Sequence, residues 1–149
     1  MLNAKTSTSA EDSLRVVTLC YRYAYLRERH DDLNRAERII WAVLQSTLEG
    51  DPERNRRSHR RMTLQAQASV RLRGIDVPAT IYDISGSGMY LETDVRLPVG
   101  SRVEVRVGQR SETEYIFGCV VTRHSERGLG LRFNGAPLEL RHGPVRACA

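Results

Sequence analysis

The apolar residues of this 149-residue chain change their spacing once, and that change divides the chain in two. From Met62 onward, apolar and polar residues alternate in several short segments, a period typical of half-buried β-strands. Residues 1–49 contain no Gly and no Pro, and their apolar residues recur at every third or fourth position. That spacing is typical of a helix with one apolar face. The pattern therefore predicts a helical N-terminal region followed by a β domain.

The helical region is predicted to span residues 11–49, and two sets of apolar residues keep helical spacing within it. The first set is Leu14, Val17, Tyr21, Ala24 and Tyr25, and the second is Leu33, Ala36, Ile40, Val43, Leu44 and Leu48. Asp31 and Asp32 lie between the sets, where they are predicted to cap a second helix. One long helix and two antiparallel helices both fit. Either form needs a partner for its apolar face, which is the β domain, a second copy or another protein.

Six segments of the second half read as strands separated by turn residues. They are centred on Met62–Leu72, Val77–Ile81, Met89–Thr93, Val103–Val107, Tyr115–Val121 and Leu129–Phe133. Short strands at this spacing predict a mainly β fold, a six-stranded antiparallel barrel with an N-terminal α-helical region. The predicted layout is a disordered start (1–10), the helical region (11–49), a basic linker (50–61), the barrel (62–135) and a tail (136–149). Within the tail, Leu138–Leu140 fits a helical turn.

The linker carries a basic cluster, with five arginines in the eight residues from Arg54 to Arg61. Residues 1–50 hold equal numbers of basic and acidic side chains, so the net charge of +5 belongs to the rest of the chain and equals that of this cluster. Arginines held so close together repel one another unless an anion lies between them. Because guanidinium groups bind phosphate oxygens in pairs, a phosphate-bearing ligand is the simplest candidate. Taken alone, the cluster also fits a solvated linker.

Composition argues against several classes of protein. No stretch approaches 18 consecutive apolar residues, and the first ten residues lack the apolar core of a signal peptide, so we expect a cytoplasmic protein with no membrane contact. The three cysteines and four histidines are scattered without metal-ligand or redox spacing. No nucleophile–base pair stands out, and we therefore expect neither an enzyme nor a bound cofactor.

A second motif, Asp83-Ile84-Ser85-Gly86-Ser87-Gly88, follows Arg61 by 22 residues. By itself it fits an ordinary hairpin turn, since Asp, Ser and Gly are common turn residues. One strand and one hairpin separate it from the arginines, so an antiparallel strand pair would bring the turn back beside them. An Asp can accept hydrogen bonds from the N–H edge of guanine, and an Arg can donate to guanine O6 and N7 or to phosphate.

Together these motifs resemble the PilZ domain family. The family signature is R-x-x-x-R before the first strand and D/N-x-S-x-x-G after the second. The chain matches it with Arg57 to Arg61 and with Asp83 to Gly88, and its Gly128–Phe133 segment is similar to the last barrel strand of the family. The resemblance covers about residues 54–135 and leaves the N-terminal helical extension outside it. It implies a six-stranded barrel that binds cyclic di-GMP, a bacterial second messenger.

The resemblance also implies roles for particular residues. Arg57 and Arg61 would hold phosphate and guanine, Asp83 and Ser85 would bond the guanine edge and nearby backbone, and Gly88 would shape the turn and leave room for the base. Arg56 and Arg60 also satisfy R-x-x-x-R, so the register stays open, with Arg57 and Arg61 preferred. In that register Arg56 directly precedes the motif, a position that the family associates with a stacked ligand dimer. Two cyclic di-GMP molecules per chain are therefore expected.

The sequence thus favours a cytoplasmic bacterial receptor that reorients its N-terminal helices on binding cyclic di-GMP and so regulates a partner protein. Residues 11–49 would serve contact with that partner or self-association. One alternative is a nucleic-acid-binding protein that uses Arg54–Arg61 against backbone phosphates. Against nucleic acid, no aromatic residues interleave with the arginines. A second alternative is an adaptor that keeps a PilZ-like barrel for protein contacts without binding the ligand.

Overall fold

The computed structural model describes residues 10–49, 61–108 and 112–141. Residues 1–9 of the expected disordered start, residues 50–60 of the predicted linker and residues 142–149 of the predicted tail lie outside these ranges. The helical elements are α1 (Ala10–Glu28), a 3₁₀ turn η2 (His30–Asp32) and α2 (Arg35–Leu48). The strands are β1 (Met62–Leu72), β2 (Ile75–Ile84), β3 (Gly88–Glu92), β4 (Arg102–Val107), β5 (Thr113–His124), β6 (Gly128–Phe133) and β7 (Leu138–Arg141). The helical region is thus two helices.

Six of these strands close into an antiparallel barrel, as the sequence predicts. Neighbouring strands follow the order β4-β1-β2-β3-β6-β5, and β5 pairs back onto β4 to complete the circle. Alternate side chains point inward, which is why the period of two was visible in the sequence. The inward side chains that are almost fully buried include Val70, Ile81, Leu91, Val105, Phe117 and Leu129.

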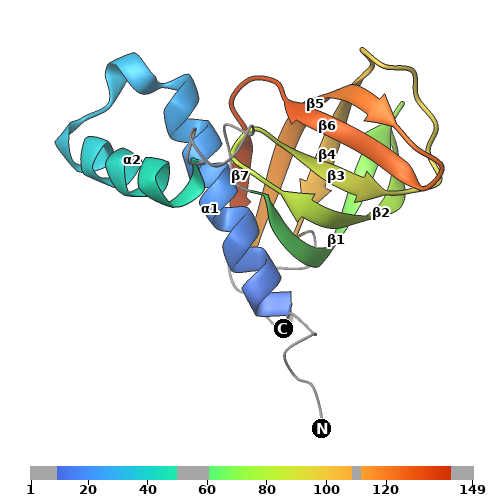
Figure 1. The fold of residues 1–149 in the computed structure, drawn as a ribbon, viewed down its shortest axis with the longest axis horizontal. Helices are drawn as coiled ribbons and strands as arrows, with labels where there is room; N and C mark the ends of the chain where they lie inside the picture. Colours follow the sequence, from blue (N-terminus) through green and yellow to red (C-terminus); the bar gives the residue numbers. More distant parts are fainter. Residues whose placement is uncertain (1–9, 50–60, 109–111, 142–149) are drawn as a thin grey trace, which may run out of the picture.

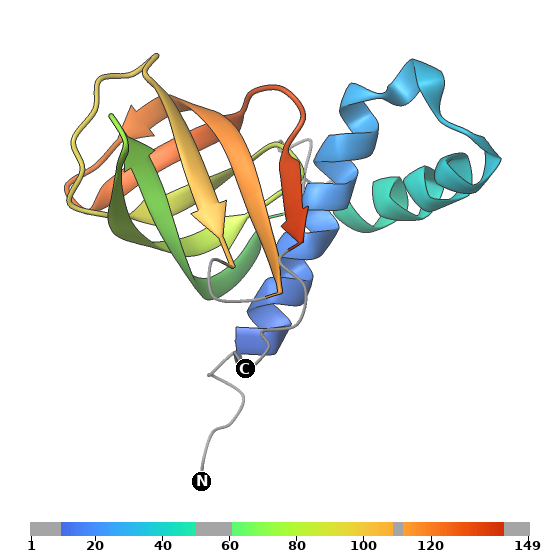
Figure 2. The same cartoon turned by 180° about the vertical axis from the view of Figure 1, so that it is seen from behind.

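The seventh strand, β7, corrects the prediction of a helical turn at residues 138–140. It pairs with the first part of β5, from Thr113 opposite Arg141 to Ile116 opposite Leu138. β6 pairs with β5 only from Cys119 onward, so the start of β5 has an open edge on that side. A short segment that returns to this edge gains backbone hydrogen bonds, which an isolated helical turn could not match. Figure 2 shows β7 between the barrel and α1.

Helix α1 packs directly on the barrel and shares its core. Val17 and Cys20 are fully buried, and Tyr21 belongs to the same apolar cluster as the inward-facing barrel residues. The ring of Tyr21 lies 4.7 Å from that of Tyr115 on β5, and the Thr18 hydroxyl donates to the Tyr115 hydroxyl at 3.0 Å. The apolar face predicted for the first helix is therefore covered by the chain's own β domain.

Helix α2 lies on the side of α1 that faces away from the barrel (Figures 1 and 2). It packs there through a second, smaller cluster, which we call the helix-pair cluster: Tyr23, Leu26, Leu33, Leu44 and Leu48, with Trp41 and Met62 against them. The rings of Tyr23 and Trp41 stack 4.9 Å apart. Next to this buried stripe, α2 leaves Ile39, Ile40 and Val43 exposed.

The start of α2 differs from the prediction that Asp31 and Asp32 cap it. The cap is Asn34, whose side chain accepts from the Glu37 N–H at 2.8 Å while the Glu37 carboxylate accepts from the Asn34 N–H at 3.0 Å. This reciprocal pair satisfies two helix N–H groups at once, which a single aspartate cap does not. Asp31 and Asp32 lie instead in the 3₁₀ turn between the helices.

No helix in the described ranges is both long and apolar enough to cross a membrane.

Candidate functional site

The turn between β2 and β3, residues 85–88, carries most of the second motif. Its backbone closes with a hydrogen bond from the Ser85 N–H to the Gly88 carbonyl at 2.8 Å. The Ser85 hydroxyl is buried inside the turn, where it accepts from the Ser87 N–H at 3.2 Å and lies 3.2 Å from the Ser87 hydroxyl. Ser85 therefore stabilises the shape of the turn.

Gly88 lies where β3 and β6 approach each other closely. A Cβ atom on Gly88 would stand 2.0 Å from the Leu131 carbonyl oxygen, far inside any normal contact. The Ser87 carbonyl accepts a hydrogen bond from the Phe133 N–H at 2.8 Å, which fastens the turn to the end of β6. Glycine is required here because of the space available, and the residue fixes the position of the whole turn.

The start of β1 lies beside this turn. Met62 pairs with Ile84 and Thr63 pairs with Asp83 in the antiparallel register of β1 and β2. The next residue outward on β1 is Arg61, which is exposed. Continuing the register by one position places Arg61 opposite Ser85. Asp83 is half-buried on the last part of β2. The fold thus places Arg61, Asp83, Ser85 and Gly88 at the same end of β1 and β2.

The remaining arginines of the basic cluster lie outside the described residues. Arg56 and Arg57 are among them, so both the choice between the two R-x-x-x-R registers and the roles expected of Arg56 and Arg57 remain predictions. Arg61 belongs to the preferred register, and it is the one arginine of the cluster whose backbone the structure describes.

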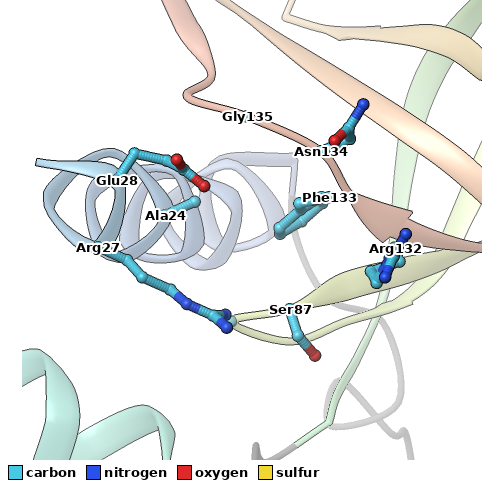
Figure 3. A pocket seen from close by; sticks show the side chains of 9 residues that line it. Ala24, Arg27, Glu28, Ser87, Arg132, Phe133, Asn134 and Gly135 are labelled. Atoms are coloured by element: carbon cyan, nitrogen blue, oxygen red, sulfur yellow. The ribbon is translucent and has the colours of Figure 1, made fainter.

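A hollow of about 260 Å³ adjoins the turn on the side of α1 (Figure 3). Three elements form its wall: the last turns of α1, the β2–β3 turn, and the end of β6 with the residues after it. Its lining residues are Ala24, Arg27, Glu28, Gly86, Ser87, Arg132, Phe133, Asn134 and Gly135. A larger hollow of about 510 Å³ lies on α1, but it shares no lining residue with the turn and contains neither motif.

A comparison with known protein families identifies the family of this barrel. Residues 55–149, more than half of the chain, match the family model of the PilZ domain. The chain belongs to the PilZ domain family. No curated protein sequence matches the chain significantly.

The PilZ domains form a family of cyclic di-GMP receptors and effectors, and they are in general ligand-binding proteins without catalytic activity. In this member the PilZ barrel carries the family's second motif on a turn that is held by its own hydrogen bonds and by β6. The helices α1 and α2 precede the matched range and are additions to the PilZ domain.

Sequence reasoning missed Arg27 and Arg132, the two basic residues at the hollow beside the PilZ motif. Neither belongs to a recognisable pattern, and more than a hundred positions separate them in the chain. The only local signal is that Arg132 lies in the Gly128–Phe133 segment, which resembles the last strand of the family. Arg27 reaches the turn because α1 packs on the barrel, a long-range effect that no local pattern encodes.

Cys20 and Cys119 are buried, and we refer to them as the two buried cysteines. Burial raises the pKa of each thiol to about 12, because the thiolate would lose its hydration. At neutral pH these thiols are therefore protonated and poorly nucleophilic. Among the residues that the structure describes, no three His, Cys, Asp or Glu side chains come together in a way that could hold a metal ion.

Proposed function

We propose that this protein is a receptor for cyclic di-GMP and that the ligand binds across the start of β1 and the β2–β3 turn. One observation carries the proposal: the register of Met62 with Ile84 and Thr63 with Asp83 brings the end of the arginine motif to the turn of the second motif. Membership of the PilZ family supports the identity of the ligand.

The side chains at the start of β1 and at the end of β2 are chemically complementary to this ligand. Arg61 offers a guanidinium fork for phosphate or for guanine O6 and N7, and the Asp83 carboxylate accepts from the guanine N–H edge. With the residues that the structure describes, neither side chain makes a hydrogen bond or an ion pair. Arg56 and Arg57, in the preceding segment, would make further contacts with the ligand.

Titration calorimetry with cyclic di-GMP tests the proposal. Arg57→Ala, Arg61→Ala and Asp83→Ala should each weaken binding at least tenfold, about 1.4 kcal/mol, because each loses a charge-assisted hydrogen bond. The matched control is Arg102→Ala, which removes an exposed arginine from the far end of the barrel, near the β1–β2 hairpin. Wild-type affinity in all three site variants would refute the site.

A parallel titration with a short DNA duplex separates the alternatives. Binding of the duplex without binding of cyclic di-GMP would favour the nucleic-acid-binding protein, which uses Arg54–Arg61. Binding of neither would favour the adaptor that keeps the barrel for protein contacts. The receptor requires that cyclic di-GMP binds and that the site variants weaken it.

For the output, we propose that the ligand reorients the helices and thereby changes the surface offered to a protein partner or a second copy. Two contacts support this. The Tyr23 hydroxyl donates to the Glu49 carboxylate at 2.9 Å, directly after α2, and Met62 packs on the helix-pair cluster directly after Arg61. Both ends of the segment that carries the other arginines are thus tied to the contact between α1 and α2. A ligand that draws this segment onto the barrel would act on that contact.

A further inference from the structure

The hollow beside the β2–β3 turn is lined by two arginines that belong to neither PilZ motif. Arg27 and Arg132 both line it, one from α1 and one from β6. Figure 3 shows the Arg27 side chain extending from the helix toward the turn at Ser87, with Arg132 beyond Ser87. Two arginines from different elements therefore line the same hollow as this serine.

Neither arginine is neutralised by the part of the protein that the structure describes. No hydrogen bond or ion pair joins Arg27 or Arg132 to a residue in the described ranges, whereas Arg29, two residues after Arg27, is paired with Glu37 at 3.2 Å. Glu28 also lines the hollow, but its carboxylate leaves the helix on the side of Gly135, away from Arg27 (Figure 3). The side of the hollow at Ser87 thus carries an excess of positive charge.

This arrangement suits a phosphate ester. Arginine forks bind phosphate oxygens in pairs, and the Ser87 hydroxyl can turn to donate to the same oxygens. The volume of about 260 Å³ is below the range of about 300–1,000 Å³ that is usual for pockets that enclose a whole ligand. The hollow would therefore hold one group of a larger ligand, with the rest lying outside it.

The position of the hollow indicates which ligand. Gly86 and Ser87 line it, and both are inner residues of the Asp83–Gly88 motif. A cyclic dinucleotide carries two phosphodiester groups, so a ligand bound on that motif would bring phosphate close to this hollow. We infer that Arg27 and Arg132 form a phosphate clamp for the bound cyclic dinucleotide, so that α1 is part of the ligand site. This inference rests on the proposed function.

The clamp gives α1 a role that the barrel alone cannot supply. Arg27 lies in the last turn of α1, next in sequence to Leu26 of the helix-pair cluster. A phosphate held between Arg27 and Arg132 bridges α1 and β6 directly. Ligand binding then acts on the contact between α1 and α2 as well as on the start of β1.

Calorimetric titration of the full chain with cyclic di-GMP tests the clamp. Arg27→Gln and Arg132→Gln should each weaken binding about tenfold. The control is Arg22→Gln, which removes an exposed arginine of the same helix that lines the other hollow. It should bind within twofold of the wild type. Glutamine is a good helix former, so α1 should persist, and unchanged thermal unfolding in each variant verifies this.

The outcomes separate the clamp from the proposed function. If Arg61→Ala weakens binding while Arg27→Gln and Arg132→Gln bind like the wild type, the clamp is refuted and the receptor stands. If the wild type does not bind cyclic di-GMP, both are refuted. Arg27→Lys should bind more tightly than Arg27→Gln because it keeps the charge. If Arg22→Gln weakened binding as much as Arg27→Gln, the loss would belong to the helix as a whole and the phosphate contact would be overturned.

Discussion

The close approach of β3 to β6 at Gly88 makes Gly88→Ala the sharpest single test of the site. An added Cβ would lie 2.0 Å from the Leu131 carbonyl oxygen and 3.1 Å from the Arg132 Cα, whereas ordinary contact begins at 3.4 Å. The two strands must therefore separate by roughly 1.4 Å at this point. Such overpacking typically costs about 1–3 kcal/mol. The hydrogen bond from the Phe133 N–H to the Ser87 carbonyl would be lost as well, at about 0.5–1.5 kcal/mol.

Together these effects predict a loss of about 2–4 kcal/mol in the free energy of unfolding. For a chain of this size, the unfolding midpoint should fall by roughly 5–15 °C. Urea unfolding followed by circular dichroism measures the loss directly. A variant as stable as the wild type would refute the close approach of the two strands.

A matched variant separates the stability of the barrel from the geometry of the ligand site. Gly128 lies at the other end of the same ladder, opposite Glu92, and a Cβ there would stand 1.8 Å from the Leu91 carbonyl oxygen. Gly128→Ala should therefore cost a similar amount of stability without moving the β2–β3 turn. At a temperature where both variants are folded, Gly88→Ala should bind cyclic di-GMP at least tenfold more weakly, and Gly128→Ala within threefold of the wild type. Equal loss of affinity in both would mean that binding follows stability and that the turn has no special role.

Three further predictions address stoichiometry, the helices and pH. Calorimetry should give two ligands per wild-type chain and one for Arg56→Leu, and a wild-type endpoint of one would contradict the preferred motif register. Hydrogen exchange across residues 10–49 should change when cyclic di-GMP is added, and protection confined to the motif segments would make the helices passive packing. The two buried cysteines have pKa values raised from 9.0 to about 12, so their contribution to stability is complete below about pH 9 and is lost as pH rises above it. The free energy of unfolding should fall above pH 9 by up to about 1.4 kcal/mol per pH unit for each thiol, and replacing either cysteine with Ala should reduce that slope in urea titrations.

The barrel and the β2–β3 turn could be predicted because their signals are local. A period of two marks each strand, and Asp, Ser and Gly mark the turn within six residues. The cap of α2 was misassigned because Asp31, Asp32 and Asn34 are all good cap residues. Only the reciprocal bond between Asn34 and Glu37 decides among them.

The error at β7 and the omission of Arg27 have a common cause in long-range packing. Residues 138–141 form a strand because the start of β5 has an open edge. The residues of that segment do not reveal the open edge. Arg27 lines the hollow beside the β2–β3 turn because Val17 and Tyr21 are buried against the barrel, which fixes where the end of α1 lies. The sequence identified one helix face that needed a partner, but the identity of the partner is a property of the whole fold.

The energetics of the two helix contacts indicate which one a ligand can change. Fully burying an apolar side chain such as Val17 is worth about 1.5–3 kcal/mol, and α1 buries several against the barrel. One charge-assisted hydrogen bond to a phosphate is worth about 1.5–3 kcal/mol, too little to detach that helix. Helix α2 packs through the smaller helix-pair cluster and leaves Ile39, Ile40 and Val43 exposed, so its position is less firmly determined. A ligand can shift the equilibrium between two arrangements of the helices only by the difference in its affinity for them. A difference of the size of one hydrogen bond is enough to move α2, which is held by the smaller cluster, but not α1. The proposed reorientation is therefore a movement of α2 against a fixed unit of α1 and barrel, with its exposed apolar face as the surface whose presentation changes.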